Sequence, residues 1–315
     1  MPNHLSSIET FIRFFDTIFS LPKMIFSSTC LQLLIIDSVP SLTSFPREGL
    51  PTSLQELGIY NCENLSFMPP ETWSNYTSLL ELTLRNSCNS LSSFPLDGFP
   101  KLQVLHIGGC SGLESIFISE SSSYHPSSLQ RLSVSSCEAL ISLPQRMDTL
   151  TALEFLDLTC LPKLEFALCE GVFLPPKLQR IYITSMRITK MPPLIEWGFQ
   201  SLTSLSTLDN DDIVNTLLKE QLLPISLVYL SISNLSEVKC LGGNGLRHLS
   251  SLETVSFYNC QRLESFPEHS LPSSLKLLRI YKCPVLEERY ESEGGRNWSE
   301  ISYIPVIEIN GKITT

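Results

Sequence analysis

One spacing of apolar residues recurs along the chain about every 24 residues. Written in single letters, it is L-x-x-L-x-[IVLF]-x-x-C-x-x-L-x-x-[LFM]-P. The copies from Leu54 and Leu129 fit every position, and the copy from Leu252 differs only in Val255. Eleven starts can be placed: Leu31, Leu54, Leu79, Leu102, Leu129, Leu153, Leu178, Leu205, Leu227, Leu252 and Leu275. A period of this length predicts a solenoid in which each copy is one stacked turn.

The chemistry of each offset fits such a turn. The second and third apolar residues are two positions apart, so they point to the same face of a short strand. The cysteine follows where the chain leaves the strand, a place where leucine-rich repeats use Asn or Cys. The predicted fold class is therefore an α/β-type solenoid. We expect a leucine-rich-repeat horseshoe of about 11 repeats, with a parallel concave sheet and a mostly irregular convex side.

A few copies depart from the spacing. The copy from Leu79 carries one extra residue before Cys88, and the sixth has Leu161 where the cysteine is expected. The copy placed at Leu205 loses the pattern in the acidic stretch 209–212. We expect a bend or surface insertion there, with the carboxylates solvated rather than holding a cation.

The repeat divides the chain into three segments. Residues 1–30 do not fit the spacing and are expected to form an irregular N-terminal cap or remnant. Residues 31–290 form the solenoid. Residues 291–315 are expected to cap its open end, because Ile304–Ile309 reads as a short strand.

Composition limits the kinds of partner. The chain has 315 residues, of which 43% are hydrophobic and 17% charged, so it can fill a continuous core. A net charge of −10 makes general nucleic-acid binding unexpected. No apolar run approaches the length of about 18 residues that a membrane span needs.

Ten cysteines occur without a C-x-x-C pair; five of them fall at the repeat offset, and Cys88 lies one residue from it. Periodic placement indicates packing residues rather than disulfides or zinc ligands. Reduced thiols of this kind fit a cytoplasmic protein.

Nothing in the sequence indicates a catalytic function. The histidines show no metal-binding spacing, and no nucleophile–base pair can be identified. Gly242–Gly245 reads as a turn, since no phosphate-binding lysine follows it. The sequence therefore predicts no enzyme, no catalytic residue, no metal and no cofactor.

The candidate site is the concave face, where the variable strand positions are exposed. Tyrosine and arginine are enriched at binding hot spots. The candidate protein-binding residues are Tyr60, Arg85, His106, Arg131, Tyr182, Tyr229, Tyr258, Arg279, Tyr281 and Lys282. Tyr258, Arg279, Tyr281 and Lys282 form the strongest patch if neighbouring strands lie about 4.8 Å apart.

Two stretches suggest a family. The sequence LPTSLQELGIYNCENL spans residues 50–65, and LPSSLKLLRIYKCPVLEERYESEGG spans residues 271–295. With the ending around Trp298 and Ile304-Pro305-Val306-Ile307, they resemble the repeat region of plant coiled-coil nucleotide-binding leucine-rich-repeat disease-resistance proteins. The resemblance covers about residues 31–315.

The resemblance implies the recognition part of a cytoplasmic immune receptor. Its partner would be a pathogen effector or a host protein, or the nucleotide-binding domain of a related receptor. The sequence contains no G-x-x-x-x-G-K-[ST] phosphate loop, so the nucleotide switch of that family is not carried over.

Two other functions stay open. One is a freestanding intracellular scaffold or adaptor with leucine-rich repeats. The other, less favoured, is a secreted enzyme inhibitor, because the L-x-G-x-I-P element of extracellular plant repeats does not occur. A nucleotide-binding domain encoded in frame upstream would distinguish the receptor part from the adaptor.

Overall fold

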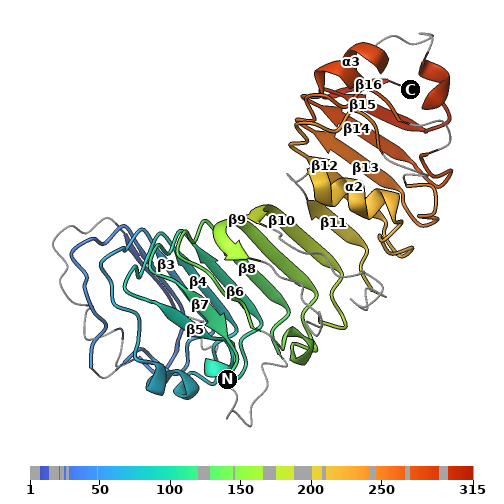
Figure 1. Cartoon of the computed structure of the whole chain (residues 1–315). Coiled ribbons are helices and arrows are strands. Elements are labelled where there is room, and N and C mark those ends of the chain that lie inside the picture. Colours follow the sequence, from blue (N-terminus) through green and yellow to red (C-terminus); the bar gives the residue numbers. More distant parts are fainter. Residues whose placement is uncertain are drawn as a thin grey trace, which may run out of the picture. The chain divides into compact units, whose positions relative to one another are not determined.

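The chain folds into two compact units, Met1–Phe166 and Ala167–Thr315, each built around a parallel sheet (Figure 1). The structure is a computed structural model. It describes residues 8–13, 21, 25, 28–47, 49–119, 128–144, 146–165, 175–187, 201–207, 211–241, 246–266, 270–290 and 297–314.

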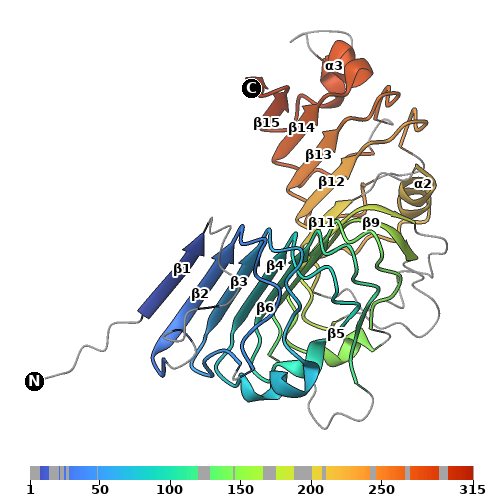
Figure 2. The same cartoon turned by 90° about the vertical axis from the view of Figure 1, so that its left-hand side faces the viewer.

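Each repeat of the first unit contributes one parallel strand to the sheet (Figure 2). In chain order these are β1 (Ile8–Arg13), β2 (Leu31–Asp37), β3 (Glu56–Tyr60), β4 (Glu81–Arg85), β6 (Val104–Gly108), β8 (Arg131–Ser135) and β9 (Phe155–Glu165). The register aligns the repeats, so that Leu57 of β3 lies opposite Leu82 of β4. The predicted leucine-rich-repeat solenoid is confirmed.

The apolar offsets of the repeat form the core. In the copy from Leu54, the residues Leu57, Ile59, Cys62 and Leu65 are all at most 2% exposed. Full burial of such side chains stabilises the fold by about 1.5–3 kcal/mol each. Leu161 is fully buried in the sixth copy, which shows that leucine takes the place of the repeat cysteine there.

The residue that directly follows β3, β4 or β8 turns the chain off the strand. Asn61, Asn86 and Ser136 have φ angles of 52°, 49° and 52°, in the left-handed region. Asparagine adopts this region at lower cost than most residues. Asn86 Nδ2 also donates to Asn61 Oδ1 at 3.2 Å, so the turns of successive repeats are linked.

The other side of the first sheet is mostly irregular, as predicted, with short helices and one extra strand pair. These elements are η1 (Pro70–Asn75), η2 (Leu96–Gly98), η3 (Met147–Thr149) and the parallel pair β5 (Ser93–Pro95) and β7 (Ser115–Phe117). Trp73 of η1 is fully buried, and its indole nitrogen donates to the Met68 carbonyl at 2.7 Å. Its ring stacks on Phe99 at 5.0 Å, so aromatic packing holds this side together.

The N-terminal segment differs from the expectation of an irregular cap. Residues 8–13 form β1, which pairs in parallel with β2. Its register places Thr10 opposite Leu34. The repeat was missed in the sequence because a threonine stands where the second leucine would be. Pairing with β1 covers the backbone hydrogen-bonding groups on that edge of β2.

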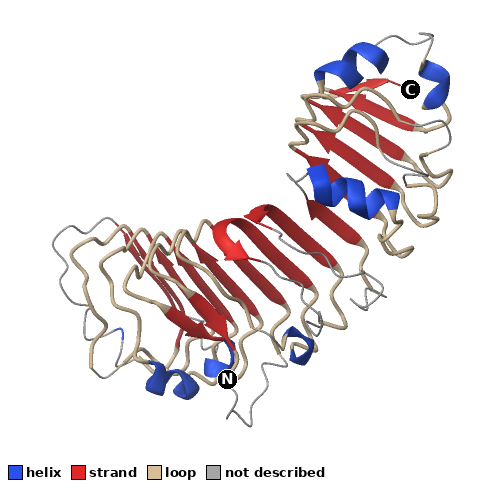
Figure 3. Cartoon of the chain, viewed as in Figure 1, coloured by secondary structure: helices blue, strands red, loops and turns tan. Residues whose placement is uncertain are grey.

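The second unit has the same organisation and more helix (Figure 3). Its strands are β10 (Arg180–Arg187), β11 (Ser204–Thr207), β12 (Tyr229–Ser233), β13 (Thr254–Tyr258), β14 (Leu277–Tyr281), β15 (Val306–Ile309) and β16 (Lys312–Thr314). Only β16 runs antiparallel to its neighbour among these strands. The helices are α2 (Asp211–Lys219), α3 (Pro284–Tyr290) and η5 (Trp298–Glu300).

The eighth repeat begins at Leu202, not at Leu205 as the sequence suggested. Leu205 pairs with Ile181 and Leu230, which are the second apolar residues of their repeats. The third apolar position is occupied by Thr207. That polar residue hides the true frame and makes the pair Leu205 and Leu208 look like the start of a copy.

A bend or surface insertion was expected at the acidic stretch, and the structure has a helix there. Residues 211–219 form α2, whose Val214, Leu217 and Leu218 are buried at helical spacing. They pack next to Leu205 and Leu230 of the sheet. Asp209 lies outside the described residues.

Asp211, at the start of α2, holds the turn of the next repeat. Its carboxylate accepts hydrogen bonds from the backbone N–H groups of Ser236, Glu237 and Val238 and from the Ser236 hydroxyl, at 2.9–3.2 Å. Burial alone would raise the pKa of Asp211, but these hydrogen bonds outweigh it and lower the pKa. A structural role therefore accounts for this acidic residue.

The C-terminal tail continues the repeat. Ile304, Ile307 and Ile309 carry the I-x-x-I-x-I spacing and are at most 7% exposed. β15 pairs in parallel with β14 and places Ile307 opposite Leu278. The capping role of the tail and the three segment boundaries stay predictions.

Candidate protein-binding surface

The ten candidate residues lie on the open face of each sheet, the side on which strand side chains remain exposed or half-buried. Tyr60, Arg85, His106 and Arg131 belong to the first unit. Tyr182, Tyr229, Tyr258, Arg279, Tyr281 and Lys282 belong to the second. None of the ten is buried; the nine that lie on strands alternate with buried apolar residues, and Lys282 follows directly after β14. The strand geometry alone produces this separation.

In the first unit, the tyrosine and arginine pair lies beside glycines. Tyr60 of β3 is opposite Arg85 of β4 in the register. A Cβ added at Gly58 would come within 2.7 Å of the Tyr60 ring, so the ring lies over Gly58. A Cβ at Gly108 would lie 3.8 Å from Arg85 Nε. Because Gly58 and Gly108 have no side chains, there is room for the larger side chains of Tyr60 and Arg85.

His106 and Arg131 occupy neighbouring strands of the first unit but different rows. His106 lies opposite Ser133 of β8, whereas the Arg131 guanidinium sits 5.6 Å from the centre of the Phe155 ring. Burial, helped by Arg131, lowers the pKa of His106. At neutral pH the imidazole is therefore uncharged and offers hydrogen-bonding atoms rather than positive charge.

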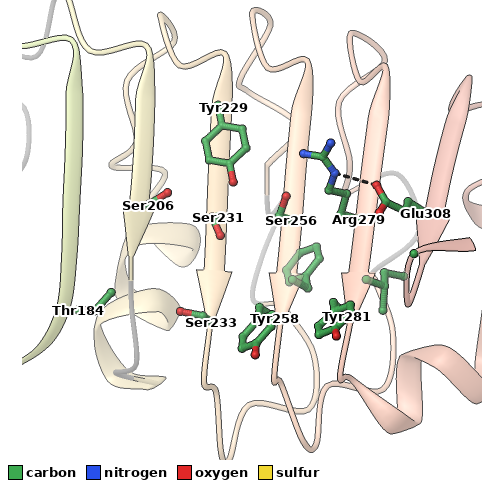
Figure 4. Close-up of a pocket in the computed structure, with 13 residues that line it drawn as sticks. Thr184, Ser206, Tyr229, Ser231, Ser233, Ser256, Tyr258, Arg279, Tyr281 and Glu308 are labelled. Carbon is green, nitrogen blue, oxygen red and sulfur yellow. Dashed lines mark hydrogen bonds and ion pairs between the residues drawn. The ribbon is translucent and has the colours of Figure 1, made fainter. Parts of the chain in front are cut away.

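The second unit has a depression of about 430 Å³ on its open face (Figure 4). Small hydroxyl side chains line much of it, and larger ones stand beside them. The small residues are Thr184, Ser206, Ser231, Ser233 and Ser256. The larger polar and aromatic residues are Tyr229, Tyr258, Arg279, Tyr281 and Glu308. Adjacent small and large side chains produce the hollow.

Two tyrosines form a stacked pair at this depression. The rings of Tyr258 and Tyr281 lie 5.3 Å apart and are inclined by 9°. Both side chains remain about two-fifths exposed, at 41% and 42%. Lys282 Nζ donates to Tyr258 Oη at 3.2 Å and lies 5.4 Å and 5.5 Å from the two ring centres. The hydrogen bond to Tyr258 raises the pKa of Lys282, which therefore stays charged.

Lys282 itself adopts a backbone conformation that is more usual for other residues, such as asparagine. Its φ is 55°, in the position where Asn234 and Asn259 stand in the preceding repeats. Its backbone N–H donates to Asn310 Oδ1 at 3.0 Å, which supports the turn. A lysine in this place carries a charged side chain to the end of the tyrosine pair.

A row of polar side chains crosses the strands above the tyrosine pair. The register joins Ser206, Ser231, Ser256, Arg279 and Glu308 as successive neighbours. Arg279 Nε donates to Glu308 Oε2 at 2.9 Å. The row thus passes from hydroxyl groups to a cation and then to an anion.

The structure brings five of the sequence candidates together. Tyr229, Tyr258, Arg279 and Tyr281 line the depression, and Lys282 contacts both stacked rings. Tyr182 of β10 is a register neighbour of Ser206 but does not line the hollow.

Sequence reasoning missed the serine row and Glu308. Serine is common on exposed strand positions and gives no signal by itself. Glu308 could have been found, because Ile304, Ile307 and Ile309 repeat the strand offsets and place it opposite Arg279.

Within the described ranges, no three His, Cys, Asp or Glu side chains gather closely enough to hold a metal ion. Among the same residues, no helix combines the length and apolar character needed to cross a membrane.

Comparison with curated proteins points to plant disease resistance. A putative disease resistance protein of Arabidopsis thaliana is 30% identical over 343 aligned residues, which cover 99% of this chain. The chain spans only 24% of the length of that protein. The putative disease resistance RPP13-like protein 1 of the same organism is 35% identical over 115 residues, covering 36% of this chain and 11% of that protein. No protein-family model matches the chain.

Solved structures with a similar backbone are leucine-rich-repeat proteins. The LRR protein LIC12759 of Leptospira interrogans gives a TM-score of 0.50 at 18% identity, covering 93% of this chain and 81% of that one. A chain in the octameric complex of Latrophilin 3, Unc5D and the LRR of FLRT2 gives 0.52 at 18% identity, covering 85% of this chain and 88% of that one. At this identity the likeness supports the fold alone.

Proposed function

We propose that this leucine-rich-repeat chain, which is related over nearly its whole length to plant disease resistance proteins, is a non-enzymatic protein-recognition module that acts in defence. Its ligand is a pathogen protein or a host protein, bound on the open face of the sheet. The proposal is confined to recognition, because the sequence holds no phosphate-binding loop.

The stacked pair of Tyr258 and Tyr281 is the observation that carries this proposal. Large aromatic side chains that are preordered and partly exposed lose little conformational entropy on binding. Stacking fixes both rings, and Lys282 holds the hydroxyl of Tyr258.

The test is capture of partners from plant leaf tissue that expresses the tagged chain. Wild type is compared with the double variant Tyr258→Ala/Tyr281→Ala, and captured proteins are quantified by mass spectrometry. A matched control is Ile225→Ala/Tyr303→Ala, which removes two exposed apolar side chains outside the strands. All three proteins must show the same melting temperature before they are compared.

We expect at least one protein to be retained by wild type and the control but lost from the tyrosine variant. That protein must then bind the purified chain directly, with an affinity about tenfold or more weaker for the tyrosine variant, as hot-spot truncation predicts. If every captured protein is retained equally by the double variant, the open face at this pair is not the recognition surface.

We also propose that the protein works in the cytoplasm. The described cysteines are all unpaired thiols, including the buried Cys62 and Cys110. Free thiols persist where the compartment is reducing. A fluorescent fusion that accumulates in the secretory pathway would contradict this and favour the secreted-inhibitor alternative.

A further inference from the structure

The open face around the depression in the second unit carries more cations than carboxylates, on a chain that is negative as a whole. The net charge of the protein is −10. On the strands around the hollow, Arg180 and Arg279 point to the open face, and Lys282 follows directly after β14. Glu308 is the carboxylate among the residues that line the hollow. A local field of this sign attracts anionic groups.

Arg279 uses only part of its hydrogen-bonding capacity on Glu308. The guanidinium has five N–H donors in a flat fork. Its contact with Glu308 runs from Nε, at 2.9 Å. Figure 4 shows the two terminal nitrogens turned away from Glu308. That edge of the fork matches the two oxygens of a second carboxylate.

Next to Arg279, a serine hydroxyl is left without a partner. Ser256 is opposite Arg279 in the register, lines the hollow and is only 9% exposed. Its Oγ makes no hydrogen bond within the described part of the chain. Leaving a buried hydroxyl unsatisfied is unfavourable. A rotation about χ1 would let it donate to a ligand oxygen in the hollow.

The other residues that line the hollow determine which kind of side chain can bind beside the carboxylate of the ligand. Tyr229 and Tyr258 stand at the hollow on the neighbouring strands β12 and β13, and Ser231 and Ser233 lie on the same strand as Tyr229. Their rings offer apolar surface, whereas the serines leave the space for a side chain to enter. The arrangement suits an acidic side chain with an apolar or aromatic neighbour in the same segment.

We infer that the hollow is a docking site for an acidic segment of a protein partner. One carboxylate of the segment lies between the outer edge of Arg279 and the hydroxyl of Ser256, and an apolar or aromatic neighbour packs against Tyr258. This inference rests on the proposed recognition function and names the chemistry of the partner. Binding at this place follows the charge complementarity between an acidic ligand and the local cations.

The probe for the test is a fluorescently labelled random copolymer of glutamate and tyrosine, measured by anisotropy with the whole chain. A lysine–tyrosine copolymer of equal length is the opposite-charge control. A single-stranded oligonucleotide of matched charge separates carboxylate recognition from general attraction of anions. Each titration is repeated at low and moderate salt, because attraction between exposed charges is screened.

Two arginine variants form the matched comparison. Arg279→Gln removes the cation that lines the hollow, and Arg262→Gln removes another partly exposed arginine, which pairs with Glu237 outside the strands. We expect Arg279→Gln to bind the acidic copolymer about tenfold more weakly, whereas Arg262→Gln stays within about twofold of wild type. Equal losses in both variants would overturn the site, since net charge alone would then explain binding.

Ser256→Ala provides a second, independent variant. It removes the hydroxyl without enlarging the residue, so the melting temperature should stay equal or rise. We expect about threefold weaker binding of the acidic copolymer. Unchanged binding would show that the hydroxyl plays no part. If the oligonucleotide binds as tightly as the acidic copolymer and loses as much affinity in Arg279→Gln, the hollow binds anions in general. Either of these two results overturns the inference as stated.

This test can fail while the proposed function survives. If the copolymer does not bind wild type, the acidic docking site is wrong. A partner captured through Tyr258 and Tyr281 would still establish recognition at the same face by other chemistry.

Discussion

The Tyr290 hydroxyl donates a 2.6 Å hydrogen bond to Oε2 of Glu300 and so joins α3 to η5. The same carboxylate accepts a hydrogen bond from Arg289 at 2.9 Å. The Tyr290 ring is fully buried and stacks on Phe266 at 5.7 Å. Burial and the bond to Glu300 raise the pKa of Tyr290. The phenol is thus protonated and serves as the donor.

Replacing Tyr290 by Phe tests this link. The ring packing is kept, but the carboxylate of Glu300 loses one donor. We expect the free energy of unfolding to fall by about 1–3 kcal/mol. Urea denaturation of wild type and variant measures the difference. The control Tyr303→Phe alters a half-exposed phenol and should change stability by less than about 0.5 kcal/mol. A loss in Tyr290→Phe as small as that of the control would mean that the bond contributes little.

Asp211 is expected to couple α2 to the following repeat. Removing its carboxylate in Asp211→Ala leaves three backbone N–H groups without their acceptor, and should destabilise the protein by about 1–2 kcal/mol. Asp212→Ala deletes the same charge one residue later and is the matched control. Thermal melts of the two variants compare them directly, and equal losses would point to the helix dipole rather than the hydrogen bonds.

The Asp211 contribution also predicts a pH dependence. Because the folded-state pKa is lowered, the stabilisation is complete above the unfolded value of about 3.9 and is lost as pH falls through the folded pKa. The stability difference between wild type and Asp211→Ala should therefore shrink below about pH 4. Melts across the acid range measure it. A difference that does not change with pH would count against a charged acceptor.

The reactivity of the cysteines should follow their burial. Burial raises the pKa of Cys110 to about 12 and raises that of Cys88 as well, so few thiolates form at these sites. Cys30, Cys160 and Cys240 are exposed. Iodoacetamide at about pH 8 should label these three and spare the buried thiols in the native protein. Peptide mass spectrometry before and after urea unfolding gives the pattern. Rapid native labelling of Cys88 or Cys110 would contradict the packed core.

The tail is predicted to protect the end of the second sheet. Deleting residues 291–315 uncovers the β14 edge and removes Ile304, Ile307 and Ile309 from the core. At about 1.5–3 kcal/mol for each buried side chain, the unfolding free energy should drop by more than about 4 kcal/mol. Calorimetry measures the change. Deleting only 312–315 removes β16, whose Lys312 and Ile313 are exposed, and should have a much smaller effect. Similar melting curves for wild type and the long deletion would exclude a capping role.

The repeat spacing predicted most of the fold because it records which side chains are buried. Where the strand positions were apolar, as in Leu57 and Ile59, the prediction was correct. It was wrong at Leu205, since Thr207 occupies a strand position that is usually apolar. It missed β1 for a similar reason, at Thr10. Tertiary pairing with a neighbouring strand can hold a polar residue in the sheet, and the spacing alone does not show this.

The candidate site was predictable in outline. Tyr258, Arg279 and Tyr281 were found because large residues at exposed strand positions stand out in the sequence. The depression itself was not predictable, because it depends on the small serine side chains beside these larger residues. The Arg279–Glu308 pair was missed because β15 follows a stretch without repeat spacing, although the isoleucines of the tail carry the strand offsets.

The constant register between β12 and β15 has a consequence for how this face can diversify. Positions about 25 residues apart along the sequence, such as Ser231 and Ser256, become lateral neighbours on one surface. Exchanging one of them alters a single point of that surface, while the leucines behind it keep their places. A substitution at an exposed strand position can thus change which partner binds without disturbing the buried core that holds the strands in place.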